Sequence, residues 1–198
     1  NMMRFDMSQY QLKEDITKLI GSIETHEPGL LTETIRKQEY GTLLLDELEK
    51  ASSDLLNIFL TVLDEGYFTD GFGKRVECKN LIVIATSNAG SDFIFTKLQD
   101  PTMTIETVSS QLIDYLVEKN IYSPEFLNRF DGVLVYKPLS KEAVTIIAQR
   151  VLAEIQNDTK IKYNIELVFT PEFVNTLITK GYDPRFGARN MKRIIQDD

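Results

Sequence analysis

The sequence feature that most constrains the fold is the segment Thr42–Glu47, in which a short apolar run ends in two adjacent carboxylates, Asp46 and Glu47. Such a run is typical of a parallel strand that is buried on both faces. Two ionised carboxylates are costly to bury unless a cation compensates their charge. At the carboxyl end of a strand in an open α/β sheet, that cation is typically Mg²⁺ on a nucleotide phosphate. The segment alone leaves a second interpretation open, in which the strand ends in a solvated acidic turn.

The residues that follow predict a further strand with a helix before it. Apolar residues recur at helical spacing over Ser52–Asp64, and Gly66 is a typical helix stop. The segment Tyr67–Lys79 contains two glycines and is predicted to form a hairpin or an extended loop. A second continuous apolar strand, Leu81–Ala85, then runs into Thr86-Ser87-Asn88. Strands alternating with helices predict an α/β fold with a parallel sheet.

The remaining elements complete this pattern on either side. Before the acidic strand we expect a strand at Arg4–Met7, then a helix capped by Ser8 and ended by Gly21, and a helical segment at Thr32–Arg36. After it, the predicted elements are a helix at 105–119, a strand at 133–136, a helix at 141–156, a short strand at 164–169 and a helix from Pro171, capped by Thr170, to Gly181. The stretch Pro138–Ser140 divides the chain into residues 1–138, a large α/β subdomain, and residues 139–198, a small lid subdomain.

The order of these motifs resembles that of the AAA+ ATPases of the Clp type, which are ring-shaped protein unfoldases and disaggregases, and specifically of their second ATPase module. The resemblance extends from about Arg4 to Gln196. It implies a three-layer, P-loop NTPase-type parallel sheet, incomplete because its first strand is absent, followed by a small, mainly helical lid. The segments that carry it are Leu45-Asp46-Glu47-Leu48-Glu49-Lys50-Ala51, Leu63–Asp70, Leu81–Asn88, Pro124-Glu125-Phe126-Leu127-Asn128-Arg129 and Gly181–Arg189.

The resemblance assigns a role to five residues. Asp46 would hold Mg²⁺, directly or through water, and Glu47 would deprotonate the water that attacks the γ-phosphate of ATP. Asn88 would be sensor 1, a neutral amide that hydrogen-bonds this water or the γ-phosphate. Arg129 would be the arginine finger that reaches the neighbouring subunit's nucleotide. Arg189 would be sensor 2, which touches the γ-phosphate from the lid.

Simpler interpretations of two of these residues remain open. Asn88 could merely occupy a turn before Gly90. Arg129 could be a surface residue paired with Asp131 or Glu125. The family usually has an arginine where this chain has Ser123, which removes one accessory charge without affecting Arg129.

Two features of the family are missing from the sequence. Residues 22–29 contain no aromatic side chain, although Clp-type proteins usually carry a longer, aromatic pore loop here. Either this loop has diverged or residues are missing from it; its His26 is expected to be a surface residue. The chain also contains no Gly-Lys-Ser/Thr phosphate loop, since its Gly73-Lys74 is followed by Arg75. We therefore expect a fragment that begins after the nucleotide loop and has little ATPase activity alone.

Charge and composition narrow the list of partners. The net charge of −8 argues against nucleic acid as the main partner. No apolar run reaches the roughly 18 residues of a membrane span, so no membrane association is expected. The single Cys78 excludes an internal disulfide and fits a reducing compartment, so we expect a cytoplasmic location.

The predicted function is ATP-dependent unfolding or remodelling of proteins. The expected partners are other copies of the chain in a ring, a hexamer by family resemblance, together with unfolded or aggregated substrate proteins. A peptidase is a further candidate partner. The alternative is a non-hydrolysing assembly or adaptor protein on the same fold, suggested by the altered pore loop and the absent phosphate loop. A nucleic-acid motor on this fold is a third candidate, which the acidic charge disfavours.

Overall fold

A computed structural model describes residues 2–182 of the chain. It contains two compact units, one made of residues 1–90 and 106–134 and the other of residues 91–105 and 135–198. The first unit carries the parallel sheet, and the second is helical. The motif Gly181–Arg189 lies almost entirely outside the described residues, and Arg189 with it.

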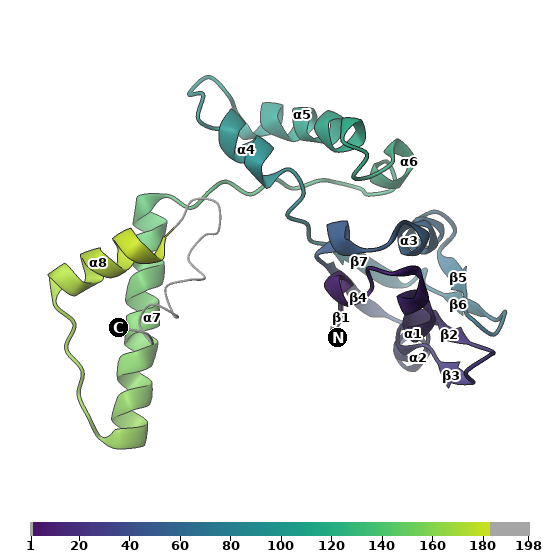
Figure 1. Cartoon of the computed structure of the whole chain (residues 1–198), viewed down its shortest axis with the longest axis horizontal. Helices are drawn as coiled ribbons and strands as arrows, with labels where there is room; N and C mark the ends of the chain where they lie inside the picture. The colour runs from purple at the N-terminus through teal and green to yellow at the C-terminus, as the bar shows by residue number, and fades with distance from the viewer. Residues whose placement is uncertain (1, 183–198) are drawn as a thin grey trace. The chain divides into compact units, whose positions relative to one another are not determined.

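Three parallel strands form the sheet of the first unit, in the order β1-β4-β7 (Figure 1). They are β1 (Met2–Asp6), β4 (Gly41–Asp46) and β7 (Leu81–Ala85). The central strand β4 pairs on one side with β1, where Asp46 lies opposite Asp6, and on the other with β7. The three predicted strands are confirmed, and because they are parallel their carboxyl ends lie at one edge of the sheet.

The sheet is covered on one face and open on the other. Phe5 and Leu45, neighbours on β1 and β4, are buried, and the buried side chains of the helices around them complete this core. On β7, by contrast, Ile82 is 66% exposed and Ile84 is 47% exposed. Arg4 shares this open face through its register partner Leu44. The core of the first unit therefore lies on one side of the sheet.

Short helical segments connect β1 to β4. The prediction that Ser8 caps the first of them is wrong. The carboxylate of Asp6 accepts the N–H of Ser8 at 2.9 Å and caps it instead, because an acidic side chain at the end of β1 reaches the free amides of the next turn. Gly21 ends the helix that closes on Ile20, as predicted, at a φ of 90°. The segments are η1 (Met7–Gln9), η2 (Lys13–Asp15), α1 (Ile16–Ile20) and α2 (Leu30–Lys37).

Two small hairpins lie beside these helices. Residues 22–29, the loop without an aromatic side chain, contribute to the first hairpin, which is built from β2 (Gly21–Ser22) and β3 (Glu27–Pro28). Its exposed tip includes His26, the predicted surface residue. The second is the predicted hairpin, built from β5 (Tyr67–Thr69) and β6 (Arg75–Glu77).

The helix between β4 and β7 is confirmed almost to the residue. The 3-10 turn η3 (Leu48–Lys50) precedes it, and α3 (Ser53–Glu65) begins where the Ser52 hydroxyl accepts the N–H of Leu55. Gly66 ends it in the left-handed conformation.

The helix predicted from its apolar stripe at 105–119 is α5 (Ile105–Glu118), followed by the short α6 (Pro124–Leu127). The strand predicted at 133–136 is wrong. Leu134 and Tyr136 are 82% and 83% exposed, and no described strand lies beside them. An apolar run without a hydrogen-bonding neighbour has no ladder that would hold it extended as a strand.

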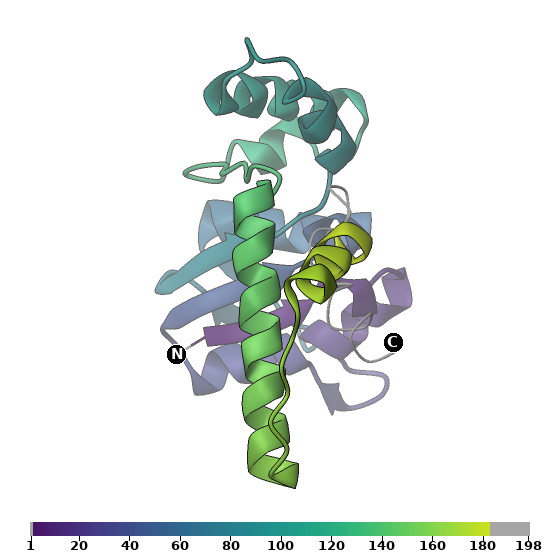
Figure 2. The same cartoon turned by 90° about the vertical axis from the view of Figure 1, so that its left-hand side faces the viewer.

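The second unit is built from α4 (Ser91–Lys97), α7 (Lys141–Tyr163) and α8 (Pro171–Gly181). Helix α7 extends beyond the predicted Gln156, and α8 lies beside its first half (Figures 1 and 2). The strand predicted at 164–169 is wrong, since these residues pair with no strand in the described chain. The core between the two helices consists of Val144, Ala148, Leu152 and Leu177.

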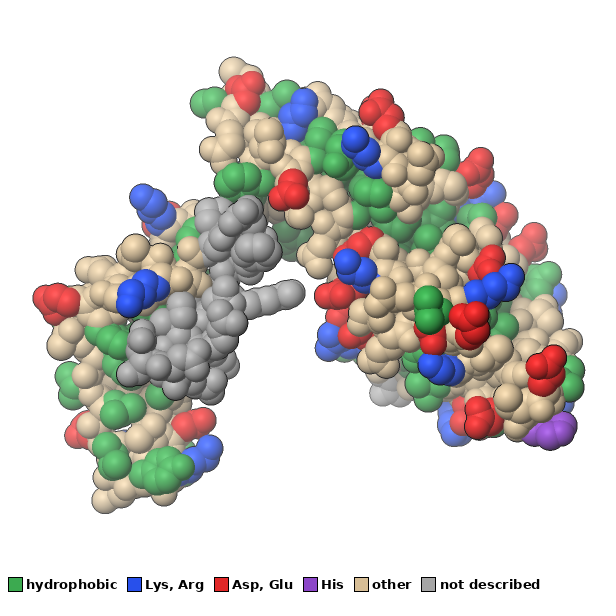
Figure 3. All heavy atoms as spheres, in the orientation of Figure 1, with side chains coloured by type: hydrophobic (Ala, Val, Ile, Leu, Met, Phe, Trp, Pro, Cys, Tyr) green, Lys and Arg blue, Asp and Glu red, His purple; other side chains and the backbone are tan. Residues whose placement is uncertain are grey.

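Acidic and basic side chains are interspersed on the face of the first unit that Figure 3 displays. No helix among residues 2–182 is both long enough and apolar enough to cross a membrane.

Candidate functional site

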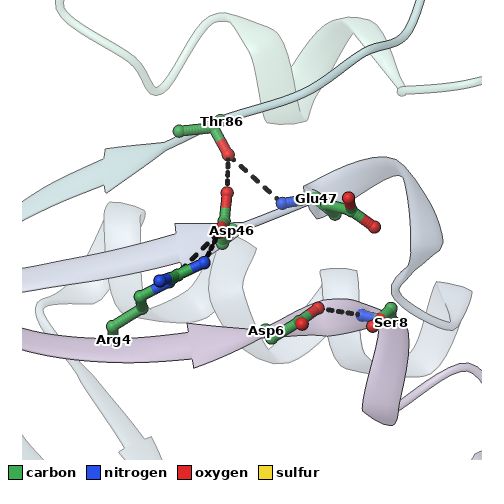
Figure 4. Close-up of polar contacts among 6 residues, drawn as sticks. All are labelled: Arg4, Asp6, Ser8, Asp46, Glu47 and Thr86. Carbon is green, nitrogen blue, oxygen red and sulfur yellow. Dashed lines mark hydrogen bonds and ion pairs between the residues drawn. The ribbon is translucent and has the colours of Figure 1, made fainter. Parts of the chain in front are cut away.

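Asp46 and Thr86 form the centre of the candidate site, at the edge where β4 and β7 end (Figure 4). The Thr86 hydroxyl donates a hydrogen bond to Oδ1 of Asp46 and accepts one from the N–H of Glu47 at 3.2 Å. The backbone of Thr86 extends the ladder, since its N–H donates to Leu45 and its carbonyl accepts from Leu48, both at 2.9 Å. One hydroxyl therefore fixes both acidic residues relative to β7.

The second oxygen of Asp46 is paired with Arg4. The guanidinium of Arg4, on the neighbouring strand β1, contacts Oδ2 through both Nε, at 3.1 Å, and Nη2. The hydrogen bonds from Thr86 and then Arg4 lower the pKa of Asp46 below its ordinary value, although burial opposes them. Asp46 is thus ionised at neutral pH, and the cation that compensates it in this structure is a side chain.

The position of Glu47 is fixed through its backbone, whose N–H donates to Thr86, and not through its side chain. Its φ of 55° and ψ of 49° lie in the left-handed region, which is uncommon for a residue with a side chain. This turn takes the chain out of β4, and Figure 4 shows the Glu47 carboxylate pointing away from Asp46. Within the described chain the Glu47 side chain makes no hydrogen bond or ion pair, so a water molecule can approach it.

Asn88 lies on the turn that follows β7. The Ser87 hydroxyl accepts the N–H of Ala89 at 3.1 Å and closes a tight turn with Asn88 in the middle. Asn88 itself is exposed. The structure therefore places Asp46, Glu47 and Asn88 at the ends of neighbouring strands, as the motif spacing predicts.

Arg129 is not part of this cluster. It follows α6 and forms an ion pair with Asp64, on α3, at 3.0 Å between Nε and Oδ1. Both side chains are nearly half exposed, at 44% and 45%. The simpler interpretation named Asp131 or Glu125 as the partner, and the observed partner is a third acid.

The residues present fit a magnesium nucleotide in one respect. Asp46 offers an ionised carboxylate at the carboxyl end of the central strand. Arg4 donates twice to its Oδ2, whereas Oδ1 accepts the Thr86 hydroxyl and keeps spare acceptor capacity. Among residues 2–182 no three acidic, histidine or cysteine side chains are grouped to hold a metal by themselves. This agrees with the chemistry of Mg²⁺, which is bound through one or two carboxylates while phosphates and water supply its other ligands.

Sequence reasoning missed Thr86 and Arg4. The signal for Thr86 was present, because in a parallel pair the first residues after two strands of matched register are neighbours. Arg4 could not be assigned in this way, since its contact depends on β1 being the strand on the other side of β4.

Two family models cover nearly the whole chain. Residues 1–133 match the AAA domain (Cdc48 subfamily), and residues 139–198 match the C-terminal, D2-small domain of ClpB protein. The chain belongs to the AAA domain family. This membership confirms the predicted resemblance and the predicted fold class, a parallel α/β sheet followed by a small helical lid.

Similar proteins point to one branch of the AAA family. The chain is 39% identical to the chloroplastic chaperone protein ClpB3 of Arabidopsis thaliana over 100% of its length and 40% identical to chaperone protein ClpB of Meiothermus ruber over 99%. It spans only 21% and 23% of these relatives. A closed-state cryo-EM reconstruction of Hsp104 with ATPγS and FITC casein has a TM-score of 0.78 and 32% identity, over 99% of this chain and 34% of that one. The roles given to Asp46, Glu47, Asn88 and Arg129 stay predictions.

Proposed function

We propose that this AAA chain is part of a ring-shaped machine that hydrolyses ATP and uses the cycle to unfold or remodel proteins. The observation that carries the proposal is the hydroxyl of Thr86, which fixes Asp46 and Glu47 together at the carboxyl end of the central strand. This is the position in an open α/β sheet where ligands bind.

The hydrolytic step assigns a separate task to each acid. Glu47, with its backbone fixed and its carboxylate turned away from Asp46, takes a proton from the attacking water. Asp46 stays ionised and holds Mg²⁺, directly or through water. Mg²⁺ held there with ATP would supply positive charge against the charge of the phosphates. Asn88, exposed on its turn, orients the water or the γ-phosphate by hydrogen bonds.

Two arginines act outside this cluster. Arg129 serves the neighbouring subunit as the arginine finger, which requires its ion pair with Asp64 to open. Exposed ion pairs contribute only about 0–1 kcal/mol, so opening costs little. Arg189 of the lid is proposed as sensor 2 and lies outside the described residues.

The assembly is proposed to be a hexameric ring of subunits in which residues 1–138 form the large subdomain and residues 139–198 the lid. Its substrates are unfolded or aggregated proteins. The similarity to the reconstruction of Hsp104 with ATPγS and FITC casein supports a nucleotide as the ligand and a protein as the substrate. Location in the cytoplasm stays a prediction, as one of the relatives is chloroplastic.

The decisive test is Glu47→Gln in the full-length protein that carries this chain. We expect the variant to bind ATP as the wild type does and to lose nearly all turnover, because an amide cannot accept the proton from water. Turnover and nucleotide binding would be measured side by side, with Glu65→Gln, an exposed acid at the end of α3, as the matched control.

The opposite result would favour the alternative function. If neither the wild type nor Glu47→Gln hydrolyses ATP under conditions where the protein assembles, the chain is better explained as a non-hydrolysing assembly or adaptor protein.

A further inference from the structure

We propose that Tyr122 is a positioning residue, whose hydroxyl holds the turn that carries Asn88 against the segment that carries Arg129. The inference rests on the proposed function and adds to it a physical connection between the two predicted γ-phosphate contacts. Neither the sequence motifs nor the family resemblance singled out Tyr122.

The first part of the connection is the turn after β7. The Ser87 hydroxyl lies 3.0 Å from the hydroxyl of Tyr122 and accepts the N–H of Ala89 at 3.1 Å. A hydroxyl that closes a turn on its own backbone is a weak restraint by itself. The Tyr122 hydroxyl is a second partner that fixes the rotamer of Ser87. Because Ser87 is also bonded to the amide of Ala89, the backbone of Asn88, which lies between these two residues, is fixed as well.

The second part is the fixed position of Tyr122. Its side chain is buried, and its ring stacks on that of Phe126 at a centroid distance of 5.7 Å. Burial raises the pKa of Tyr122 to about 12; the hydrogen bond with Ser87 acts in the opposite direction, and the charge of Glu49 adds to the rise. The hydroxyl is therefore protonated at neutral pH and remains a neutral partner for Ser87.

The third part leads from Tyr122 to Arg129. The ring of Phe126 also meets that of Phe130, edge to face at 5.4 Å, and the carbonyl of Phe126 accepts the N–H of Arg129 at 3.2 Å. Helix α6 begins immediately after Tyr122, with the Ser123 hydroxyl as its cap. Tyr122 is thus packed into the element from which Arg129 emerges.

This arrangement has a functional consequence. Asn88 serves the nucleotide of its own subunit, whereas Arg129 serves the neighbouring one. A rigid link between them means that a shift of one contact is transmitted to the other. Small displacements of groups that position reactants lower rates steeply.

The test uses Tyr122→Phe, Ser87→Ala and the double variant in the full-length protein. Tyr122→Phe removes one oxygen and keeps the stacking on Phe126. We expect each single variant to lower kcat for ATP by about three- to ten-fold with little change in KM, as expected for the loss of one hydrogen bond felt in the transition state. The double variant is expected to be no slower than Ser87→Ala, which by itself removes both bonds of the Ser87 hydroxyl. The matched control is Tyr40→Phe, because Tyr40 is 71% exposed and the substitution likewise removes one hydroxyl.

A second measurement on the chain itself examines the contact independently of catalysis. Hydrogen exchange at the amide of Ala89 is expected to accelerate in Tyr122→Phe and to stay at the wild-type rate in Tyr40→Phe. If Tyr122→Phe disrupts the core, Ser87→Ala removes the same bond from an exposed position, together with the bond to the Ala89 amide. It is expected to lower kcat by at least as much.

Three results would overturn the inference: wild-type kcat in Tyr122→Phe, fully additive losses in the double variant, or unchanged exchange at Ala89. Failure of the proposed function is recognised separately, because the full-length protein would then lack any hydrolysis that depends on Glu47. The exchange at Ala89 would still decide whether Tyr122 holds the turn.

Discussion

The ionised state of Asp46 is favoured by its two neighbours, Thr86 and Arg4. Its carboxylate accepts from Thr86 on one oxygen and from Arg4 on the other, and both bonds favour the ionised form. A carboxyl group whose pKa is lower in the folded chain than in the unfolded chain stabilises the fold at neutral pH. That contribution is complete above the unfolded value and is lost as the pH falls through the folded value.

Comparing the wild type with Asp46→Asn tests this linkage. We expect the urea midpoints of the two proteins to differ by a constant amount near neutral pH and to converge below about pH 4, the ordinary value for aspartate. Thr86→Val removes one of the two favourable contacts and so raises the folded pKa of Asp46 towards its ordinary value. In that background the convergence should begin at the same pH, which the unfolded pKa sets, but should be complete at a higher pH. If the urea midpoints of the wild type and Asp46→Asn still differ by the same amount below about pH 4, the lowered pKa of Asp46 would be contradicted.

The candidate site was predictable only in part, for a reason that these residues make plain. Asp46 and Glu47 stand out because two acids after an apolar run are unusual along a sequence. Thr86 and Tyr122 do not stand out, since their roles arise from contacts with residues 40 and 35 positions away. Such contacts depend on strand order and packing, which no local pattern contains.

At the scale of elements, the hairpin β5–β6 is attached to its surroundings by Asp70. Its buried carboxylate accepts the N–H groups of Phe72 and Lys74 on Oδ1 and the guanidinium of Arg36, from α2, on Oδ2 at 2.9 Å. Burial alone would raise the pKa of Asp70, but these bonds together hold it below its ordinary value. Beside it, a side chain at Gly71 would collide with the backbone of Gly21, so the two hairpins are tightly packed.

Replacing Asp70 separates the two functions of its carboxylate. Asp70→Ala leaves two amides without an acceptor and should lower the free energy of unfolding by about 2–4 kcal/mol. Asp70→Asn keeps an acceptor for both amides and loses only the ion pair, so its loss should be clearly smaller. Equilibrium urea denaturation would measure both. Equal losses would mean that the ion pair, rather than the turn, dominates.

Element prediction succeeded where the signal is local. The helix α3 follows from its apolar spacing, its Ser52 cap and its Gly66 stop, all of which act within a few residues. The strands expected at 133–136 and 164–169 failed because a strand needs a neighbour, and an apolar or β-branched run does not specify one.

At the scale of the whole molecule, the open face of the sheet is the most consequential surface. The apolar side chains of Ile82 and Ile84 are exposed on β7, and among residues 2–182 this strand pairs only with β4. An exposed apolar edge strand readily pairs with another chain.

We therefore expect the chain, studied alone, to self-associate as its concentration rises. Sedimentation velocity would follow this, and Ile82→Lys or Ile84→Lys should shift the population towards monomer because a charge at a sheet edge opposes pairing. Leu12→Lys, at a residue 63% exposed elsewhere in the first unit, is the control. A monomer at every concentration, or an equal effect of the control, would contradict the expectation.

The left-handed backbone of Glu47 lowers local stability at the residue whose carboxylate is proposed to activate water. A residue with a long side chain costs about 1 kcal/mol or more in this conformation, whereas glycine and asparagine adopt it readily. Selection for stability alone would favour those two residues at this position. If the carboxylate removes a proton from water, neither can replace it. The residues that would make the turn most stable are therefore different from the residue that the reaction requires. At this position the chain has glutamate, the residue that the reaction requires.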